Sequence, residues 1–280
     1  MYRLLALDLD GTVLNSKHQI SQPLLDTIHN LPDDIVVVIV TGRHHTAAKP
    51  YYDQLQLTSP IICCNGTYIY NYQASDVLYE DAIAKEHAVE FLSLCDQFHM
   101  KKIMYVTDAM LYDECNPMAH METLRDWSLS FPECDRPNIL KISDFETPIR
   151  ESDYVWKFVV EGEDDNIDAF SKHPFIQREF NGEQSFINRF DFARKGNTKG
   201  NRLTEYIKVL GIFPEQVVAI GDNHNDISMI EVAGMGVTLA HAEEVVKNAS
   251  NYVINSSNDD QYGLANFINS LFTPSLSEQQ

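Results

Sequence analysis

The chain of 280 residues is about twice the usual length of a domain, and 44% of its residues are apolar, so we expect two domains with substantial cores. Its 41 acidic residues against 21 Lys and Arg give a net charge of -20, which argues against nucleic acid and anionic membranes as partners. No window holds the roughly 18 apolar residues that cross a bilayer, and no signal peptide precedes the first apolar run, so we expect a cytoplasmic protein. Cys63 and Cys64, adjacent in an apolar segment, are predicted to be buried thiols, and a structural, reduced state is favoured for all five cysteines.

The first predicted strand, Leu4–Leu7, leads directly into two aspartates. Asp8 and Asp10 are two residues apart, so both carboxylates leave the same face of a strand. Open α/β sheets bind ligands beyond the carboxyl ends of their strands. Two carboxylates this close repel each other unless a cation or a shared proton lies between them. The segment therefore predicts an active site with a metal, a shared proton or both.

Strands and helices alternate up to about residue 82, which predicts a parallel sheet. The β-branched run Val36–Val40 predicts a buried strand that ends at Thr41 and Gly42. A hydroxyl followed by free backbone N–H groups suits a phosphoryl oxygen. The apolar segment 60–64 predicts a third strand, and segments 68–72 and 77–79 predict a hairpin.

The pattern changes from about residue 83 to an α+β insert. This insert holds predicted helices at 84–98 and 122–129 and predicted strands at 102–106, 110–112 and 154–160. We place it at 83–189, so that the first domain consists of 1–82 and 190–272 and the chain crosses between the domains twice. The polar, Pro-containing segment 273–280 predicts a flexible tail.

Two further motifs follow the insert. Lys199 lies in a loop rich in Gly and Asn, ahead of a predicted helix at 201–210. The strand-like run Val217–Ile220 opens into a glycine and a cluster of oxygen ligands that contains Asp222, Asn225 and Asp226. Carboxylate and carbonyl oxygens, with no Cys or His pair at zinc spacing, favour Mg²⁺.

The four motifs, in this order, resemble those of the haloacid dehalogenase-like hydrolases, and the insert between the second and third resembles the large C2-type cap of the Cof-type subgroup. This resemblance implies an α/β fold, with a Rossmann-like, three-layer parallel-sheet core and an inserted α+β cap built of an antiparallel sheet with two helices. It also implies a phosphoric monoester hydrolase that works through an aspartyl-phosphate intermediate.

The resemblance implies a role for each motif residue. Asp8 is the nucleophile, Asp10 the general acid and base, and Lys199 pairs with the nucleophile and the phosphate. The implied Mg²⁺ ligands are the side chains of Asp8 and Asp222 and the backbone carbonyl of Asp10. Asp226 is implied next to these ligands, where it orients the loop or contributes through a water molecule. The residues implied in phosphate binding are Leu9, Thr41, Gly42, Lys199 and Asn225.

The substrate follows only from a closer resemblance, in which segments 41–45, 63–68, 104–110 and 155–158 are similar to Cof-type phosphatases that act on pyridoxal 5′-phosphate. A broad sugar-phosphate (hexose phosphate) phosphatase is the alternative. A phosphomutase is less favoured because 11–32 is too short for a helical cap, and a non-catalytic regulator because both Asp8 and Asp10 are present. The candidate substrate contacts are Arg43, His44, Asn65, Tyr105, Asp108 and Trp156. For Tyr105 and Trp156, core packing is the stronger reading, and the sequence sets no oligomeric state.

Overall fold

The computed structural model describes residues 1–272, so the predicted tail at 273–280 lies outside the described residues. The chain forms two compact units. The first contains Met1–Gly42, Pro50–Asp76 and the segment that begins at Thr198, and the second contains Arg43–Lys49 and Val77–Asn197. The chain therefore passes between the units at four places instead of two, because α2 (His45–Gln54) begins in the second unit and ends in the first. None of the helices described is both long and apolar enough to span a membrane.

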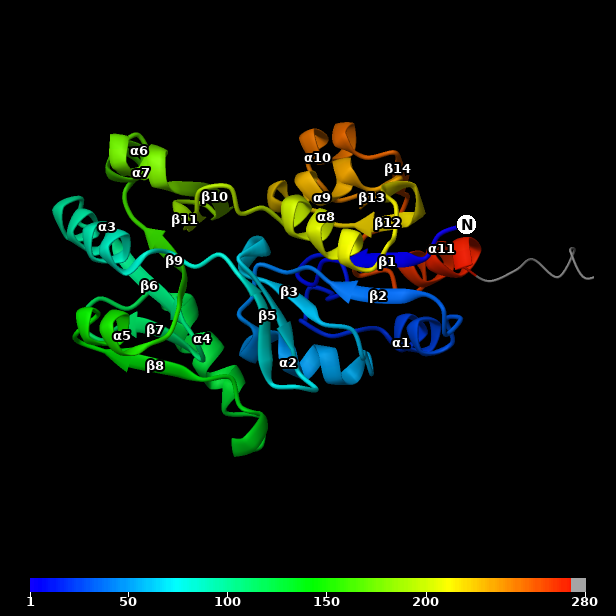
Figure 1. Cartoon of the computed structure of the whole chain (residues 1–280), viewed down its shortest axis with the longest axis horizontal. Helices are drawn as coiled ribbons and strands as arrows, with labels where there is room; N and C mark the ends of the chain where they lie inside the picture. Colours follow the sequence, from blue (N-terminus) through cyan, green and yellow to red (C-terminus); the bar gives the residue numbers. More distant parts are fainter. Residues whose placement is uncertain (273–280) are drawn as a thin grey trace, which may run out of the picture. The chain divides into compact units, whose positions relative to one another are not determined.

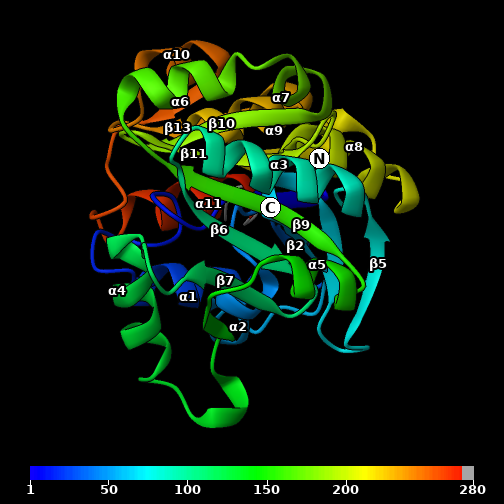
Figure 2. The same ribbon diagram turned by 90° about the vertical axis from the view of Figure 1, so that its left-hand side faces the viewer.

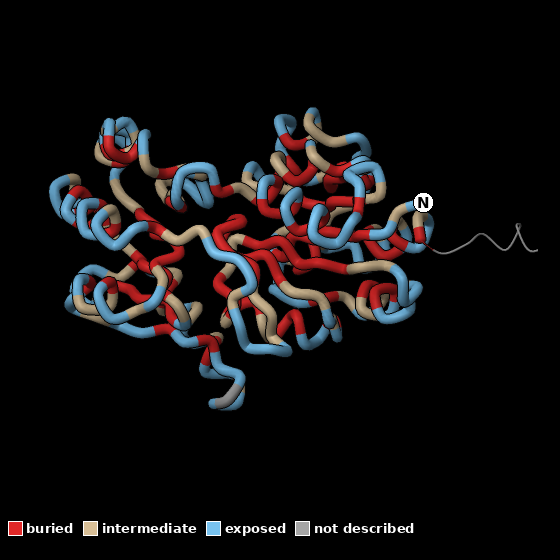
Figure 3. The backbone as a smooth tube through the Cα atoms, in the orientation of Figure 1, coloured by how far each residue is buried: buried red, intermediate tan, exposed pale blue. Residues whose placement is uncertain are grey.

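A five-stranded parallel sheet forms the centre of the first unit (Figure 1). Its strands, in spatial order, are β14 (Tyr252–Ile254), β13 (Met235–Leu239), β12 (Val217–Ile220), β1 (Leu4–Leu7) and β2 (Val36–Ile39). Every residue of β1 and β12 is buried, as Figure 3 shows, which is why these segments read as continuous apolar runs. The predicted α/β fold with a parallel core sheet is confirmed.

Helices cover both faces of this sheet. α8 (Lys199–Val209) and α9 (Ile227–Val232) lie on one face, and α1 (Gln22–His29) and α11 (Gly263–Phe272) lie on the other (Figure 1). α10 (Glu244–Ala249) packs against α9 and β13. Leu4 and Ala6 share a core with Leu203 and Ile207 of α8. Since successive strand residues face opposite sides, β1 contributes to two cores.

The third predicted strand departs from the expected alternation. β3 (Ile61–Cys63) pairs antiparallel with β4 (Tyr68–Asn71), and it meets the line of β2 through one parallel bridge between Val40 and Ile62. The strand stops before Cys64, because the chain there enters the 3₁₀ turn η1 (Cys64–Gly66). Both Cys63 and Cys64 are buried, as predicted. β5 (Asp76–Glu80) follows where the sequence predicts the second strand of the hairpin.

The second unit is built on a six-stranded mixed sheet. Its strands, in spatial order, are β10 (Phe180–Phe186), β11 (Arg189–Arg194), β9 (Val155–Glu161), β6 (Lys101–Val106), β7 (Ala109–Asp113) and β8 (Ile139–Ile142). Neighbouring strands are antiparallel except β7 and β8, which are parallel. The sheet implied by the family resemblance was antiparallel throughout.

The helices of the second unit enclose an aromatic core. Four of them cover one face of the sheet (Figure 2): α3 (Lys85–Gln97), α5 (Glu146–Glu151), α6 (Asp164–Ser171) and α7 (Pro174–Glu179). Phe91 stacks on Phe158 with ring centroids 4.3 Å apart and meets Phe170 edge-on. α4 (Ala119–Ser128) belongs to the other face, where Tyr112 donates to Glu122. The insert therefore holds more helices than the two that the resemblance implied.

The bounds of the second unit differ from the predicted insert. Its main segment begins at Val77 instead of residue 83 and ends at Asn197 instead of residue 189. The difference at the far end arises from the hairpin of β10 and β11, which the sequence analysis missed. Most side chains of β10 are polar and exposed or half-buried, so the strand lacks the apolar alternation that reveals others. Asp191, where the first domain was expected to resume, lies in β11.

Candidate active site

The polar residues of the first, second and fourth motifs meet at one edge of the parallel sheet. β1 lies between β2 and β12, and Leu7 pairs in register with Ile39 and Ile220. The three strands therefore end together. Asp8 follows β1 directly, and Thr41 and Asp222 each lie two residues beyond their strands. Segments from both ends of the sequence thus supply one site at the carboxyl edge.

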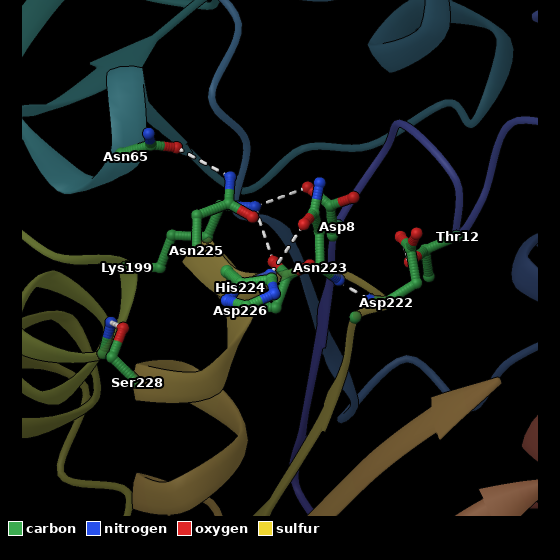
Figure 4. Close-up of polar contacts among 12 residues, drawn as sticks. Asp8, Thr12, Asn65, Lys199, Asp222, Asn223, His224, Asn225, Asp226 and Ser228 are labelled. Atoms are coloured by element: carbon green, nitrogen blue, oxygen red, sulfur yellow. Dashed lines mark hydrogen bonds and ion pairs between the residues drawn. The ribbon is translucent and has the colours of Figure 1, made fainter. Parts of the chain in front are cut away.

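A buried ammonium group lies between two buried carboxylates in this site. Lys199, in the first turn of α8, places Nζ 2.5 Å from Asp8 Oδ1 and 2.6 Å from Asp226 Oδ1 (Figure 4). Burial alone would lower the pKa of Lys199, but Asp226 and Asp8 raise it above its usual value, so the side chain is charged. Burial raises the pKa of Asp8 well above its ordinary value, and Asp226 adds to this while Lys199 opposes it. The site thus holds more negative charge than Lys199 balances.

Asp226 organises the loop that follows β12. Its Oδ2 accepts hydrogen bonds from the backbone N–H groups of Asp222 and Asn223, both at 3.0 Å, and its Oδ1 accepts from Lys199. The loop continues into the 3₁₀ turn η4 (His224–Asp226). Since both oxygens of Asp226 already accept hydrogen bonds, this side chain is arranged to orient the loop rather than to serve as an open ligand.

Asp222 is held by two side chains to which the sequence analysis gave no role. Its Oδ1 accepts a hydrogen bond of 2.8 Å from the Thr12 hydroxyl, and its Oδ2 lies 3.4 Å from His241 Nε2. The hydrogen bond with Asp222 raises the pKa of His241, against the effect of burial. Thr12 was visible as part of the first motif. His241 follows β13 and lies outside the four motifs, so only its residue type could have suggested a role in the site.

The carboxylates fit a hard divalent cation. One oxygen from each of Asp8, Asp222 and Asp226 lies within 4.8 Å of the other two, and the charge excess around Asp8 favours a cation. Carboxylate ligands suit Mg²⁺. Asp10 stands apart from this cluster, because its side chain is 47% exposed and lies 3.8 Å from His18 Nδ1. The family resemblance implies that Asp10 binds the metal through its backbone carbonyl, and the position of its side chain is compatible with this.

The implied phosphate-binding residues lie around the same edge. Thr41 is fully buried, and its backbone N–H donates to Ile62 at 2.9 Å. Gly42 is next to Asn225, since a Cβ added to Gly42 would lie 3.7 Å from Asn225 Nδ2. Leu9 is fully buried.

Among the candidate substrate contacts, Asn65 belongs to the first unit, where its Oδ1 accepts from Asn225 Nδ2 at 3.1 Å (Figure 4). The other five candidates lie in the second unit.

Three of those candidates are tightly packed side chains. Trp156 is fully buried, stacks on Tyr154 and donates to the carbonyl of Thr107 at 3.3 Å. His44 is also fully buried and bonds the carbonyl of Val106. Tyr105 is 8% exposed and packs edge-on against His44. Core packing is the interpretation that the sequence favoured for Tyr105 and Trp156.

Two candidates in the second unit keep exposed surface. Arg43 is half-buried and lies over the Trp127 ring at 5.7 Å. Asp108 is 73% exposed, and its Oδ1 lies 3.7 Å from His45 Nε2. Both therefore remain open to a ligand.

Comparison with known proteins places the chain among phosphatases. Residues 5–268 match the model of a family described as haloacid dehalogenase-like hydrolase. The pyridoxal phosphate phosphatase YbhA of Escherichia coli (strain K12) is 37% identical over 268 residues, which cover 95% of this chain and 97% of that protein. The 5-amino-6-(5-phospho-D-ribitylamino)uracil phosphatase YitU of Bacillus subtilis (strain 168) is 25% identical, over 96% of this chain and 97% of its own. A solved haloacid dehalogenase-like hydrolase from Bacteroides thetaiotaomicron superposes with a TM-score of 0.82 at 27% identity, covering 97% of this chain and 100% of that one.

Proposed function

Since the chain belongs to the haloacid dehalogenase-like hydrolase family, we propose that it is a Mg²⁺-dependent phosphatase whose substrate is pyridoxal 5′-phosphate. The observation that carries the proposal is the contact of the Lys199 ammonium with Asp8 at the end of β1. A fixed positive charge beside a carboxylate orients a nucleophile and attracts the phosphate that it attacks. The choice of substrate rests on the 37% identity with the E. coli enzyme. In this proposal the first unit carries the chemistry and the second is the C2-type cap.

The proposed reaction has two phosphoryl-transfer steps. A carboxylate oxygen of Asp8 attacks phosphorus in line, the bond from phosphorus to the leaving oxygen breaks, and Asp10 donates its proton to that oxygen. Asp10 then takes a proton from a water molecule, which attacks phosphorus, and the bond from phosphorus to Asp8 breaks to release inorganic phosphate. The exposure of the Asp10 side chain, at 47%, suits a group that exchanges protons with both an alcohol and water.

The remaining residues hold the phosphoryl oxygens. Lys199 contributes its charge, and Thr41 and Asn225 contribute donors, in positions fixed before substrate arrives. Mg²⁺ held by Asp8, Asp222 and the carbonyl of Asp10 would supply further positive charge against those oxygens. Thr12 and His241 keep the Asp222 carboxylate in place.

Phosphate release tests the proposal. We expect the purified chain to release phosphate from pyridoxal 5′-phosphate with a higher kcat/KM than from glucose 6-phosphate, and Asp8→Asn to serve as the blank. EDTA should abolish release, and excess Mg²⁺ should restore it, because the carboxylate cluster then recovers its cation.

The outcomes separate the parts of the proposal. Preference for the sugar phosphate would contradict the proposed substrate but not the proposed phosphatase activity. Release that persists in EDTA would contradict the metal dependence, and release by Asp8→Asn at the wild-type rate would contradict the nucleophile.

A further inference from the structure

A buried loop next to the site adopts a conformation that its residues rarely take. Cys64, Asn65 and Gly66 all have positive φ, at 50°, 57° and 89°. A non-glycine residue in the left-handed region is uncommon, and here two are consecutive. All three residues are buried, with Asn65 5% exposed. Such strain persists only where the surroundings enforce it, and it concentrates at functional sites.

Contacts on both sides enforce this conformation. The backbone N–H of Asn65 donates to the carbonyl of Thr41 at 3.1 Å, and the carbonyl of Gly66 accepts from Arg202 Nε at 2.7 Å. A Cβ added to Gly66 would lie 2.2 Å from the carbonyl oxygen of Thr198, so only glycine fits there. The loop is thus fixed between the end of β2 and the start of α8, next to Lys199.

The loop presents the amide of Asn65 to the amide of Asn225. Asn225 Nδ2 donates to Asn65 Oδ1 at 3.1 Å, as the dashed line in Figure 4 shows. The space is tight, because a Cβ added to Gly42 would lie 2.9 Å from the same oxygen. An amide nitrogen carries two N–H groups, so Asn225 keeps a second one for a ligand. Asn225 Oδ1 is buried and accepts no hydrogen bond among the described residues, so the bond from Nδ2 to Asn65 orients this amide.

We propose that Asn65 is a positioning residue of the phosphate site: it fixes the amide of Asn225 so that the second N–H meets a phosphoryl oxygen. The inference rests on the proposed function, in which Asn225 binds phosphate. It gives Asn65 a role in orienting Asn225, whereas the sequence predicts Asn65 as a substrate contact. The strained loop then holds the acceptor Asn65 Oδ1 next to Asn225, between the second and fourth motifs.

Two substitutions separate the amide from the backbone conformation. Asn65→Gly keeps the left-handed backbone accessible and removes the acceptor, whereas Asn65→Ala removes the acceptor and adds backbone strain. For both, we expect the KM for substrate and the dissociation constant of inorganic phosphate to rise about tenfold, the order of one hydrogen bond. Only Asn65→Ala should also lower the urea midpoint clearly. The affinity for Mg²⁺, measured by calorimetry without substrate, should not change, because Asp8 and Asp222 are untouched.

A double-mutant cycle tests whether Asn65 acts through Asn225. In an Asn225→Ala background, Asn65→Gly should cause no further rise in the phosphate dissociation constant. Asn188 provides a matched control, since it is also a left-handed asparagine, at φ 58°, in the turn between β10 and β11. Asn188→Gly should leave phosphate binding and KM at wild-type values.

The possible results are distinct. Wild-type phosphate affinity in Asn65→Gly, or an undiminished tenfold effect in the Asn225→Ala background, would overturn the positioning role while the phosphatase stands. A wild-type protein that binds phosphate by calorimetry but hydrolyses no phosphomonoester would overturn the proposed function, and the variants would still decide the role of Asn65. A wild-type protein that binds no phosphate would overturn both.

Discussion

Two lysines of this chain are buried beside aspartates, one in each unit, and they differ in charge balance. Lys199, in the first unit, contacts Asp8 and Asp226 within a cluster that also includes Asp222. Lys157, in the second unit, places Nζ 2.5 Å from Asp191 Oδ2 and 4.7 Å from the centre of the Tyr105 ring. The side chains of Lys157 and Asp191 are 3% and 13% exposed.

The difference shows how to read a buried ion pair. In a pair of one ammonium and one carboxylate the two charges balance. Replacing such a buried pair by apolar side chains of similar size often leaves the stability of the protein unchanged. Burial raises the pKa of Asp8, and a cluster with more carboxylates than ammonium groups adds repulsion from Asp226 that raises it further. An excess of carboxylates over ammonium groups favours a bound cation, which is typical of a functional site.

The largest effect that we expect is on turnover. Asp8→Asn should reduce kcat by about 10⁴-fold or more, as the loss of a nucleophile does in other hydrolases. In the metal-free protein at pH 7.5, the same change should leave the urea midpoint equal or raise it, because a neutral amide replaces a carboxylate whose charged form burial disfavours. A marked loss of stability would show that the Lys199 cluster is structural, like the Lys157 pair.

The next effect is on the stability of the second unit. Lys157→Met alone should lower the free energy of unfolding by about 3–5 kcal/mol, because it leaves the Asp191 carboxylate buried and unpaired. The double variant Lys157→Met/Asp191→Leu should recover most of that loss. Both tryptophans of the chain, Trp127 and Trp156, lie in the second unit, so intrinsic fluorescence during urea unfolding reports on this change. A double variant no more stable than the single one would contradict the view that this pair is replaceable.

The smallest effect is a pH dependence in the same unit. Burial lowers the pKa of His44 to about 4. The hydrogen bonds with the backbone of Val106 and Thr107 oppose this shift, and the charge of Lys157 adds to it. Its Nδ1 accepts from the backbone N–H of Thr46, so Nε2 carries the proton given to Val106 and the ring is neutral.

The sign of that dependence follows from linkage. Between the unfolded value near 6.5 and the folded value near 4, the unfolded chain binds more protons, so stability is complete above pH 6.5 and falls as the pH falls. At pH 5 the loss due to His44 should be about 2 kcal/mol. His44→Asn should lose less stability than wild type between pH 7.5 and pH 5, whereas His29→Asn, at an exposed position, should match wild type. Equal losses in His44→Asn and wild type would show that His44 does not contribute to the pH dependence.

The sequence carried enough local information to locate most of the site. Apolar runs that end in Asp8, Thr41 and Asp222 are visible without a structure, because a parallel strand buried on both faces is apolar along its length and its polar ligands must follow it. The family resemblance then placed Lys199, whose loop alone is not distinctive. The predicted roles of these residues await the experiments above.

Only the tertiary structure determines the contacts between residues that lie far apart in the chain. The bond from Asn225 to Asn65, the approach of His241 to Asp222 and the pairing of Lys157 with Asp191 have no trace in local periodicity, since each depends on strand register and loop conformation. For the same reason Asp191 was mistaken for the return of the first domain. Periodicity reports which face of an element is buried, but packing decides which side chain it meets there.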